Sequence, residues 1–209
     1  MKKVSTLLVE YIKKCGVTHI FGIPGEPKAH LNIEIEKQGI KCVMCRHECA
    51  AGFAASGYAL MNRTLGVVVV TAGSFEMNML TAARQAKAMK IPILFITGYP
   101  SMRETCNLLG PYPTLIDSDM VEMFESVTLF SARIERSEVF PHYLQLAIEK
   151  GLRGRGPVHL NIPVDVLKQE IEPFEFDLPQ YSPLKSSEID RIIPLLIAGA
   201  KNSMMRKAI

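Results

Sequence analysis

The most chemically varied stretch of the sequence is 42–49, which reads CVMCRHEC. Thiolate and imidazole groups are the ligands that zinc prefers in proteins. The spacing argues against zinc, because Cys42 is expected on a strand whose side chains alternate in direction, whereas Cys49 is expected in a helix. Four ligands so close in sequence rarely surround one tetrahedral ion. The cysteines are therefore interpreted as small apolar side chains, and no metal site is predicted in this chain.

Glu48 is the other reactive group of this stretch, and it is expected where a strand passes into a helix. The helix after it is almost uncharged (AAGFAASGYAL). A carboxylate there can exchange a proton with a bound molecule, or it can simply stabilise the positive end of the helix. The small residues leave little bulk on the helix. It is either squeezed between a sheet and a neighbouring element or approached closely by a second subunit, and both interpretations stay open.

The segment 71–78 (TAGSFEMN) is a further candidate, because Gly73 permits a tight turn and the next helix offers free N–H groups to an anion. One glycine is weak support for a phosphate site, and neither the dinucleotide-binding fingerprint nor the phosphate-loop pattern occurs. The sequence also has no G-x-S-x-G nucleophile motif. His19 and His159 fall in predicted strands and are interpreted as core histidines with hydrogen-bond partners.

The elements that must position these residues alternate between helix and strand. Helices are predicted at about 4–15, 27–38, 48–62, 75–89, 117–124 and 138–150, and strands at 17–21, 40–44, 66–70, 92–97, 126–130 and 157–162. Strands that are apolar on both faces are typical of a parallel sheet covered by helices on both sides. In such sheets ligands bind at the carboxyl ends of the strands, which directs attention to residues 22–26, 45–49, 71–78 and 98–115.

The last fifth of the chain differs in composition from the rest. We predict a domain at 1–168, an acidic, proline-containing linker at 169–186, and a truncated start of a further domain at 187–209. A helix is expected near 187–200. Its apolar residues have nothing obvious in this chain to pack against.

Composition excludes several classes of protein. The chain has 209 residues, of which 48% are hydrophobic, and a net charge of +3 with no concentrated basic segment, so binding to nucleic acid is not expected. No apolar run is long enough to cross a bilayer. Five cysteines are an odd number and too few for a disulfide scaffold. The protein is therefore expected to be soluble and cytoplasmic, without a membrane partner.

Five blocks of the sequence, taken in order, resemble a known family. They are 21–25 (FGIPG), 46–59 (RHECAAGFAASGYA), 66–80 (GVVVVTAGSFEMNML), 91–98 (IPILFITG) and 156–166 (GPVHLNIPVDV). Together they resemble the N-terminal, pyrimidine-binding domain of thiamine-diphosphate enzymes, the superfamily of acetolactate synthase, pyruvate oxidase and the 2-oxoacid decarboxylases. The resemblance covers about residues 3–168. It implies a doubly wound α/β domain with a mostly parallel six-stranded sheet and helices on both faces, which works as a dimer.

The resemblance assigns the family's catalytic glutamate to Glu48, which would share a proton with N1′ of the aminopyrimidine ring of the cofactor, thiamine diphosphate. The cofactor supplies the carbanion chemistry, and the protein supplies position and proton control. The cofactor-binding residues implied in this way are Pro24, Gly25, Glu48, Thr71, Gly73 and Asn78.

The sequence departs from the family pattern at two places. Acetolactate synthases carry Gly-Pro-Gly where this chain has Gly73, Ser74 and Phe75, and the family's active-site glutamine would fall near Ile116. Phe75 and Glu76 could instead line a different substrate pocket. The sequence does not name the 2-oxoacid.

The family binds diphosphate through Mg²⁺ in a separate domain that begins with Gly-Asp-Gly, and no such tripeptide occurs here. The chain is therefore expected to hold at most half of the cofactor and to be inactive alone. It is either a fragment or a subunit of a split enzyme, like the two-chain sulfopyruvate decarboxylases. The expected partners are a second copy or a diphosphate-binding chain, and the expected substrate is a small 2-oxoacid, for decarboxylation or carboligation. The alternative is a non-catalytic interaction or regulatory remnant of the same fold.

Overall fold

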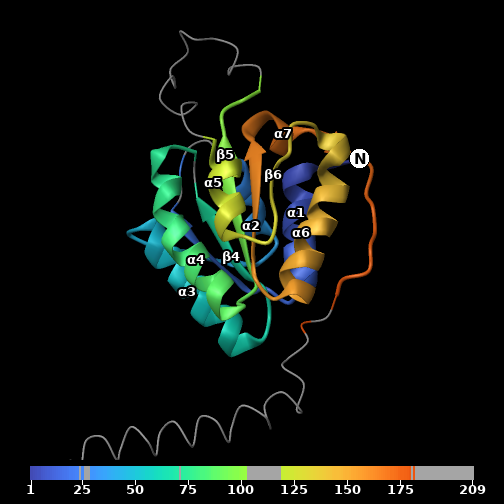
Figure 1. Ribbon diagram of the computed structural model, residues 1–209. Coiled ribbons are helices and arrows are strands. Elements are labelled where there is room, and N and C mark those ends of the chain that lie inside the picture. The colour runs from blue at the N-terminus through green and yellow to red at the C-terminus, as the bar shows by residue number, and fades with distance from the viewer. Residues whose placement is uncertain (24, 26–28, 71, 103–118, 180, 182–209) are drawn as a thin grey trace, which may run out of the picture.

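A six-stranded sheet, parallel throughout, forms the centre of the computed structural model (Figure 1), which describes residues 1–23, 25, 29–70, 72–102, 119–179 and 181. Its strand order is β3-β2-β4-β5-β7-β6. The strands are β2 (His19–Ile23), β3 (Lys41–Met44), β4 (Gly66–Val70), β5 (Ile93–Tyr99), β6 (Ser131–Arg133) and β7 (Pro157–Pro163). The predicted doubly wound α/β fold with six parallel strands is confirmed.

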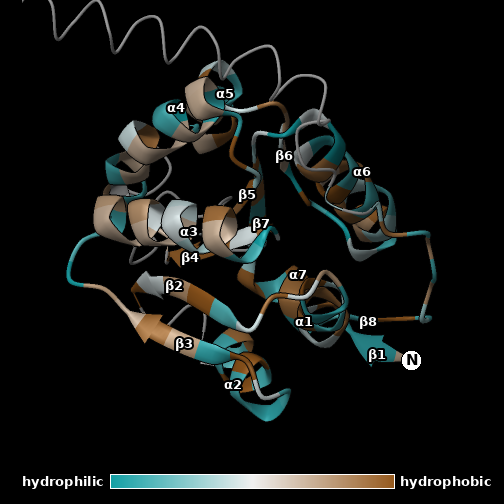
Figure 2. Cartoon of the chain, turned by 90° about the horizontal axis from the view of Figure 1, so that it is seen from below, coloured by the Kyte–Doolittle hydropathy of each residue, from teal (hydrophilic) through white to brown (hydrophobic). Residues whose placement is uncertain are grey.

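Helices cover both faces of the sheet, as Figure 2 shows from below. One layer contains α1 (Val4–Lys14), α2 (Ala29–Lys37), α6 (Phe140–Gly154) and α7 (Val164–Lys168), and the other contains α3 (Glu48–Asn62), α4 (Leu80–Met89) and α5 (Met120–Val127). Two 3₁₀ helices, η2 (Ser74–Met79) and η4 (Ser137–Val139), precede α4 and α6. Alternate residues of each strand point to opposite layers. Val67 and Val69 of β4 pack with α1 and α6, whereas Val68 and Val70 pack with α3 and α4.

Most predicted elements are present, and α3 begins and ends at the predicted residues. The glycine predicted after the first helix, Gly16, has a left-handed φ of +82°, which an L side chain rarely adopts. The predicted strand at 126–130 is wrong. Asp119 caps α5 by accepting a hydrogen bond from the Val121 N–H at 2.8 Å, so the helix starts later than predicted and runs to Val127, and the strand that follows is β6.

The predicted linker is packed against the domain as far as the structure describes it. Within it, β8 (Glu170–Ile171) pairs with β1 (Lys2–Lys3) in an antiparallel ribbon. Phe174 and Phe176 then stack on Tyr11 of α1, with ring centroids 5.1 and 4.4 Å away, and the Tyr11 hydroxyl donates a hydrogen bond to the Phe174 carbonyl. Phe174 and Phe176 are therefore packed against α1. The helix predicted at 187–200 lies outside the described residues.

No helix among the described residues is both long enough and apolar enough to cross a membrane.

Candidate functional site

Glu48 lies at the carboxyl edge of the sheet, as the first residue of α3, just after β3. The preceding residue, His47, caps the helix: its Nδ1 accepts a hydrogen bond from the Cys49 N–H at 3.2 Å. This cap orients the first turn of α3, so that the Glu48 side chain turns inward and is 7% exposed. The carboxyl group therefore lies at the positive end of a helix, where a negative charge is stabilised, and it is largely shielded from bulk water.

Asn78, in the segment that follows β4, forms a hydrogen bond with the Glu48 carboxylate. Its Nδ2 donates a hydrogen bond to Glu48 Oε2 at 3.0 Å. Asn78 belongs to η2, which follows β4 after a turn at Gly73. Gly73 has φ 139° and ψ 176°, a backbone conformation that is essentially restricted to glycine. The predicted tight turn at Gly73 is confirmed, and it delivers Asn78 to the glutamate.

The described members of the predicted site are gathered at the ends of three adjacent strands. Gly25 lies two residues beyond β2, Glu48 follows β3, and Gly73 and Asn78 follow β4. In the sheet these strands are neighbours in the order β3-β2-β4. The structure joins Glu48 and Asn78 by a direct hydrogen bond. Pro24 and Thr71 lie outside the described residues, as does Ile116.

The small residues of α3 let the helix lie close to its neighbours. A Cβ on Gly52 would come 2.4 Å from the Ala82 Cβ of α4, and a Cβ on Gly66 of β4 would come 2.5 Å from the Ala55 carbonyl oxygen. The helix thus packs closely against both the sheet and the neighbouring helix α4, which agrees with the first of the two interpretations. Its other face exposes Phe53, Leu60 and Met61, so the small residues do not bury the helix completely.

The cysteines near the site are not arranged as a metal centre. Cys42, Cys45 and Cys49 are free thiols, and within the described ranges no three His, Cys, Asp or Glu side chains come together in a way that could hold a metal ion. Burial raises the pKa of the Cys42 thiol, and the carboxylate of Glu36 and the thiol of Cys45 add to this effect. A raised thiol pKa disfavours the thiolate, the form that binds metals and attacks electrophiles.

Cys15, at the end of α1, gives a stability prediction. Burial raises the pKa of its thiol from 9.0 to about 12. The unfolded chain therefore loses this proton at a lower pH than the folded protein, and the stabilisation, complete below about pH 9, falls as the pH rises from 9 towards 12. Urea unfolding should show a wild-type free energy that drops by on the order of 1 kcal/mol more than that of Cys15→Ala between pH 8 and pH 10.5. Parallel curves for the two proteins would contradict this.

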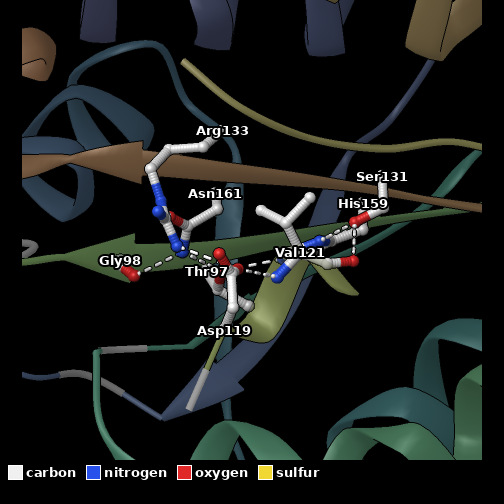
Figure 3. Close-up of polar contacts among 8 residues, drawn as sticks. All are labelled: Thr97, Gly98, Asp119, Val121, Ser131, Arg133, His159 and Asn161. Carbon is white, nitrogen blue, oxygen red and sulfur yellow. Dashed lines mark hydrogen bonds and ion pairs between the residues drawn. The ribbon is translucent and has the colours of Figure 1, made fainter. Parts of the chain in front are cut away.

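The sequence did not reveal a second buried polar cluster, centred on β7. His159, interpreted as a core histidine with partners, is fully buried, and its ring nitrogens lie 2.8 Å from the hydroxyls of Thr97 and Ser131, so that interpretation is confirmed. Asn161 donates to Thr97 and Gly98 and accepts from Arg133. No local pattern could predict this network (Figure 3), because the six residues come from three strands, β5, β6 and β7, that are separated in the chain by helices and loops.

The two residues proposed to line a different substrate pocket face in different directions. The Phe75 side chain is 60% exposed, whereas Glu76 is 2% exposed. The Glu76 side chain is therefore buried within the fold, and of these two residues only Phe75 is accessible to another molecule.

A doubly wound parallel sheet with a shielded, hydrogen-bonded carboxylate at its carboxyl edge defines an α/β domain of the class in which ligands bind at the ends of the strands. Residues 2–118 match the family model described as the thiamine pyrophosphate enzyme, N-terminal TPP binding domain. The chain belongs to this family.

The curated proteins similar to this chain include a synthase, a decarboxylase and a lyase. The chain is 30% identical over 188 residues to a probable acetolactate synthase large subunit of Methanocaldococcus jannaschii, which covers 87% of this chain and 31% of that protein. It is 36% identical over 163 residues to a probable 2-ketoarginine decarboxylase of Pseudomonas aeruginosa, and the match covers 77% of this chain and 28% of that protein. It is 34% identical over 162 residues to 2-hydroxyacyl-CoA lyase 2 of Caenorhabditis elegans, and the match covers 77% of this chain and 24% of that protein. The chain thus spans a third or less of the length of these relatives.

Proposed function

We propose that this chain forms the pyrimidine-binding half of a thiamine-diphosphate site, in an enzyme that decarboxylates or joins 2-oxoacids. The observation that carries the proposal is the Glu48 carboxylate, 7% exposed and held by Asn78. When bound, the cofactor supplies a carbanion at its thiazolium ring. Glu48 would hold the proton that is exchanged with N1′ of the aminopyrimidine.

The arrangement of the carboxylate fits this role. The hydrogen bond from Asn78 occupies Oε2 and fixes the plane of the carboxyl group. Among the described residues nothing donates a hydrogen bond to Oε1, so this oxygen is free to meet a ring nitrogen. Burial would strengthen the hydrogen bond between Glu48 and the ring nitrogen, because such a bond gains from the exclusion of water. Asn78 therefore acts as a positioning residue for Glu48.

The other half of the cofactor would bind elsewhere. The sequence lacks Gly-Asp-Gly, and the described residues hold no group of acidic, cysteine or histidine side chains suited to a metal. The Mg²⁺ and diphosphate would therefore be bound by a further domain, in another chain or in a longer form of this one.

The test is a titration with thiamine diphosphate and Mg²⁺, followed by calorimetry. This chain alone should bind weakly or not at all, and binding should become tight after the addition of a chain that carries the Gly-Asp-Gly domain. Release of CO₂ from a panel of 2-oxoacids should appear only in the mixture. Tight Mg²⁺-dependent binding by this chain alone would contradict the half-site proposal.

The second candidate is a non-catalytic remnant of the fold, which the Ser74-Phe75 pair in place of Pro-Gly favours. The buried, positioned acid favours the catalytic role, because a remnant gains little from a shielded carboxylate that must be desolvated. A partner that binds this chain without any gain in thiamine-diphosphate affinity or CO₂ release would favour the remnant.

We further propose that the exposed face of α3 meets a second copy or the diphosphate-binding chain. Phe53, Leu60 and Met61 expose 42%, 47% and 84% of their surface along this face, and clusters of exposed apolar side chains mark interaction sites. The face begins at Phe53, five residues after Glu48 on the same helix.

A charge on this face should break the assembly. Leu60→Glu is expected to shift the protein, alone or mixed with its partner chain, to monomers in size-exclusion chromatography with light scattering, because a carboxylate would be buried in an apolar contact. Ile33→Glu is the matched control: Ile33 of α2 is 48% exposed but lies in the opposite helical layer. The same assembly state for Leu60→Glu and wild type would count against this face.

A further inference from the structure

An accessible aromatic side chain, Phe75, belongs to the same short helix as Asn78. Both residues are in η2, where the Glu76 N–H donates a hydrogen bond to the Gly73 carbonyl at 3.0 Å. A 3₁₀ helix has three residues per turn and rises about 2.0 Å per residue, so side chains at positions i and i+3 are eclipsed. Phe75 and Asn78 have this spacing. Their side chains therefore leave η2 on the same side, about 6 Å apart along its axis.

The burial of η2 follows the same period. Glu76 is 2% exposed and Met79 is fully buried, and this pair, with the same spacing, forms the inward face of the helix. Phe75 is 60% exposed and Met77 is 37% exposed, whereas Asn78 is partly exposed. The Phe75 ring therefore lies outside the packed interior, on the side of η2 that also carries the Asn78 amide.

The Asn78 side of η2 faces the Glu48 carboxylate. Asn78 Nδ2 donates to Glu48 Oε2 at 3.0 Å, and η2 follows the carboxyl end of β4, at the edge where ligands bind in sheets of this kind. A molecule bound against Glu48 and Asn78 thus has the Phe75 ring within about one turn of η2.

The chemistry of this neighbour is apolar. An exposed phenyl ring offers surface that an apolar group of a ligand can remove from water, and contact between two aromatic rings adds to that gain. A charged group placed on the ring would lose water, and the ring offers it no hydrogen bond in return. The side of the site next to Asn78 therefore favours an apolar ligand group over a charged one.

We infer that Phe75 is a specificity-determining residue, which favours a 2-oxoacid with an aromatic or branched apolar side chain over one that is small or carries a second carboxylate. The inference rests on the proposed function, because it names the substrate class of the same site. Phe75 takes no part in proton exchange, which stays with Glu48.

The first test compares 3-phenylpyruvate, pyruvate and 2-oxoglutarate as substrates of this chain mixed with the chain that carries the Gly-Asp-Gly domain. Wild type should have its highest kcat/KM for 3-phenylpyruvate. Phe75→Ala should lower that value by about tenfold and change the value for pyruvate by less than about twofold. Phe75→Arg should shift the preference towards 2-oxoglutarate, because a guanidinium binds a carboxylate. Met77→Ala is the matched control on another side of η2 and should leave all three values unchanged.

The second test does not require turnover. The unreactive acid 3-phenylpropionate, which lacks the 2-oxo group, is titrated against the ¹⁵N-labelled full chain, with succinate as its polar counterpart. The aromatic acid should shift the backbone amides of residues 75–79 with a Kd on the order of millimolar, and succinate should not. Phe75→Ala should bind 3-phenylpropionate about fivefold more weakly.

The two tests distinguish the role of Phe75 from the proposed function. Absence of CO₂ release from every acid, with 3-phenylpropionate still bound through Phe75, would overturn the proposed function and leave the apolar site. The role of Phe75 is overturned if wild type prefers pyruvate or 2-oxoglutarate, if Phe75→Ala loses activity equally on all three acids, or if 3-phenylpropionate shifts none of these amides. Failure of Phe75→Ala to assemble with its partner chain, measured by light scattering, would also overturn it, because the ring would then belong to a protein contact.

Discussion

Replacing Glu48 by Gln is expected to reduce 2-oxoacid turnover by the assembled enzyme at least a hundredfold, with the fold unchanged. Gln keeps the size of the side chain and an oxygen that can accept the Asn78 hydrogen bond, but it cannot exchange a proton. General acid–base catalysis typically contributes about 10²- to 10⁴-fold. The measurement is CO₂ release by the mixture of this chain with its diphosphate-binding partner, and circular dichroism checks the fold.

Two further variants separate proton exchange from positioning. Glu48→Asp keeps the acid but draws it back by one methylene, and Asn78→Ala keeps the acid but removes the group that holds Oε2. Both should lower kcat by about tenfold and change KM little, because loss of position costs less than loss of the exchangeable proton. Turnover by Glu48→Gln within a few-fold of wild type would remove Glu48 from the mechanism and, with it, the proposed function.

A methyl group on Gly22 should have the largest effect on stability. Gly22 of β2 is paired with Val69 of β4, and a Cβ there would come 1.9 Å from the Val69 carbonyl oxygen and 3.0 Å from its carbonyl carbon. Backbone atoms inside a sheet cannot move aside without breaking the ladder. Gly22→Ala should therefore lower the free energy of unfolding by about 3 kcal/mol or more, measured by urea denaturation.

Gly57→Ala is the matched control for this experiment. Gly57 is exposed on α3, and a Cβ there would meet nothing within 4 Å. Alanine has a higher helix propensity than glycine, so this variant should raise the free energy of unfolding by about 0.5–1 kcal/mol. Equal stabilities for Gly22→Ala and wild type would show that β2 and β4 can separate at this point, and the close strand packing beneath the site would then be disproved.

Much of the fold follows from local sequence. The apolar run GVVVV and the alanine-rich segment after Glu48 specify β4 and α3 by composition and period alone, and both were predicted to the residue. The end of α5 was not predicted correctly, because the apolar residues between Phe124 and Phe130 suit a helix or a strand. The cap at Asp119 fixes where the helix begins, and the hydrogen bond from the Thr128 hydroxyl to the Phe124 carbonyl closes its last turn.

The sequence by itself determined the class of fold, the family and the position of the acid along the chain, because each depends on residue types and on their order in the sequence. The tertiary structure alone decided which group holds that acid, since Asn78 is 30 residues away and reaches Glu48 only after the turn at Gly73. It likewise decided the orientation of Arg133 and the docking of residues 170–178 on α1. These depend on contacts between segments distant in the chain, and such contacts are set by the packing of the whole sheet rather than by local preference.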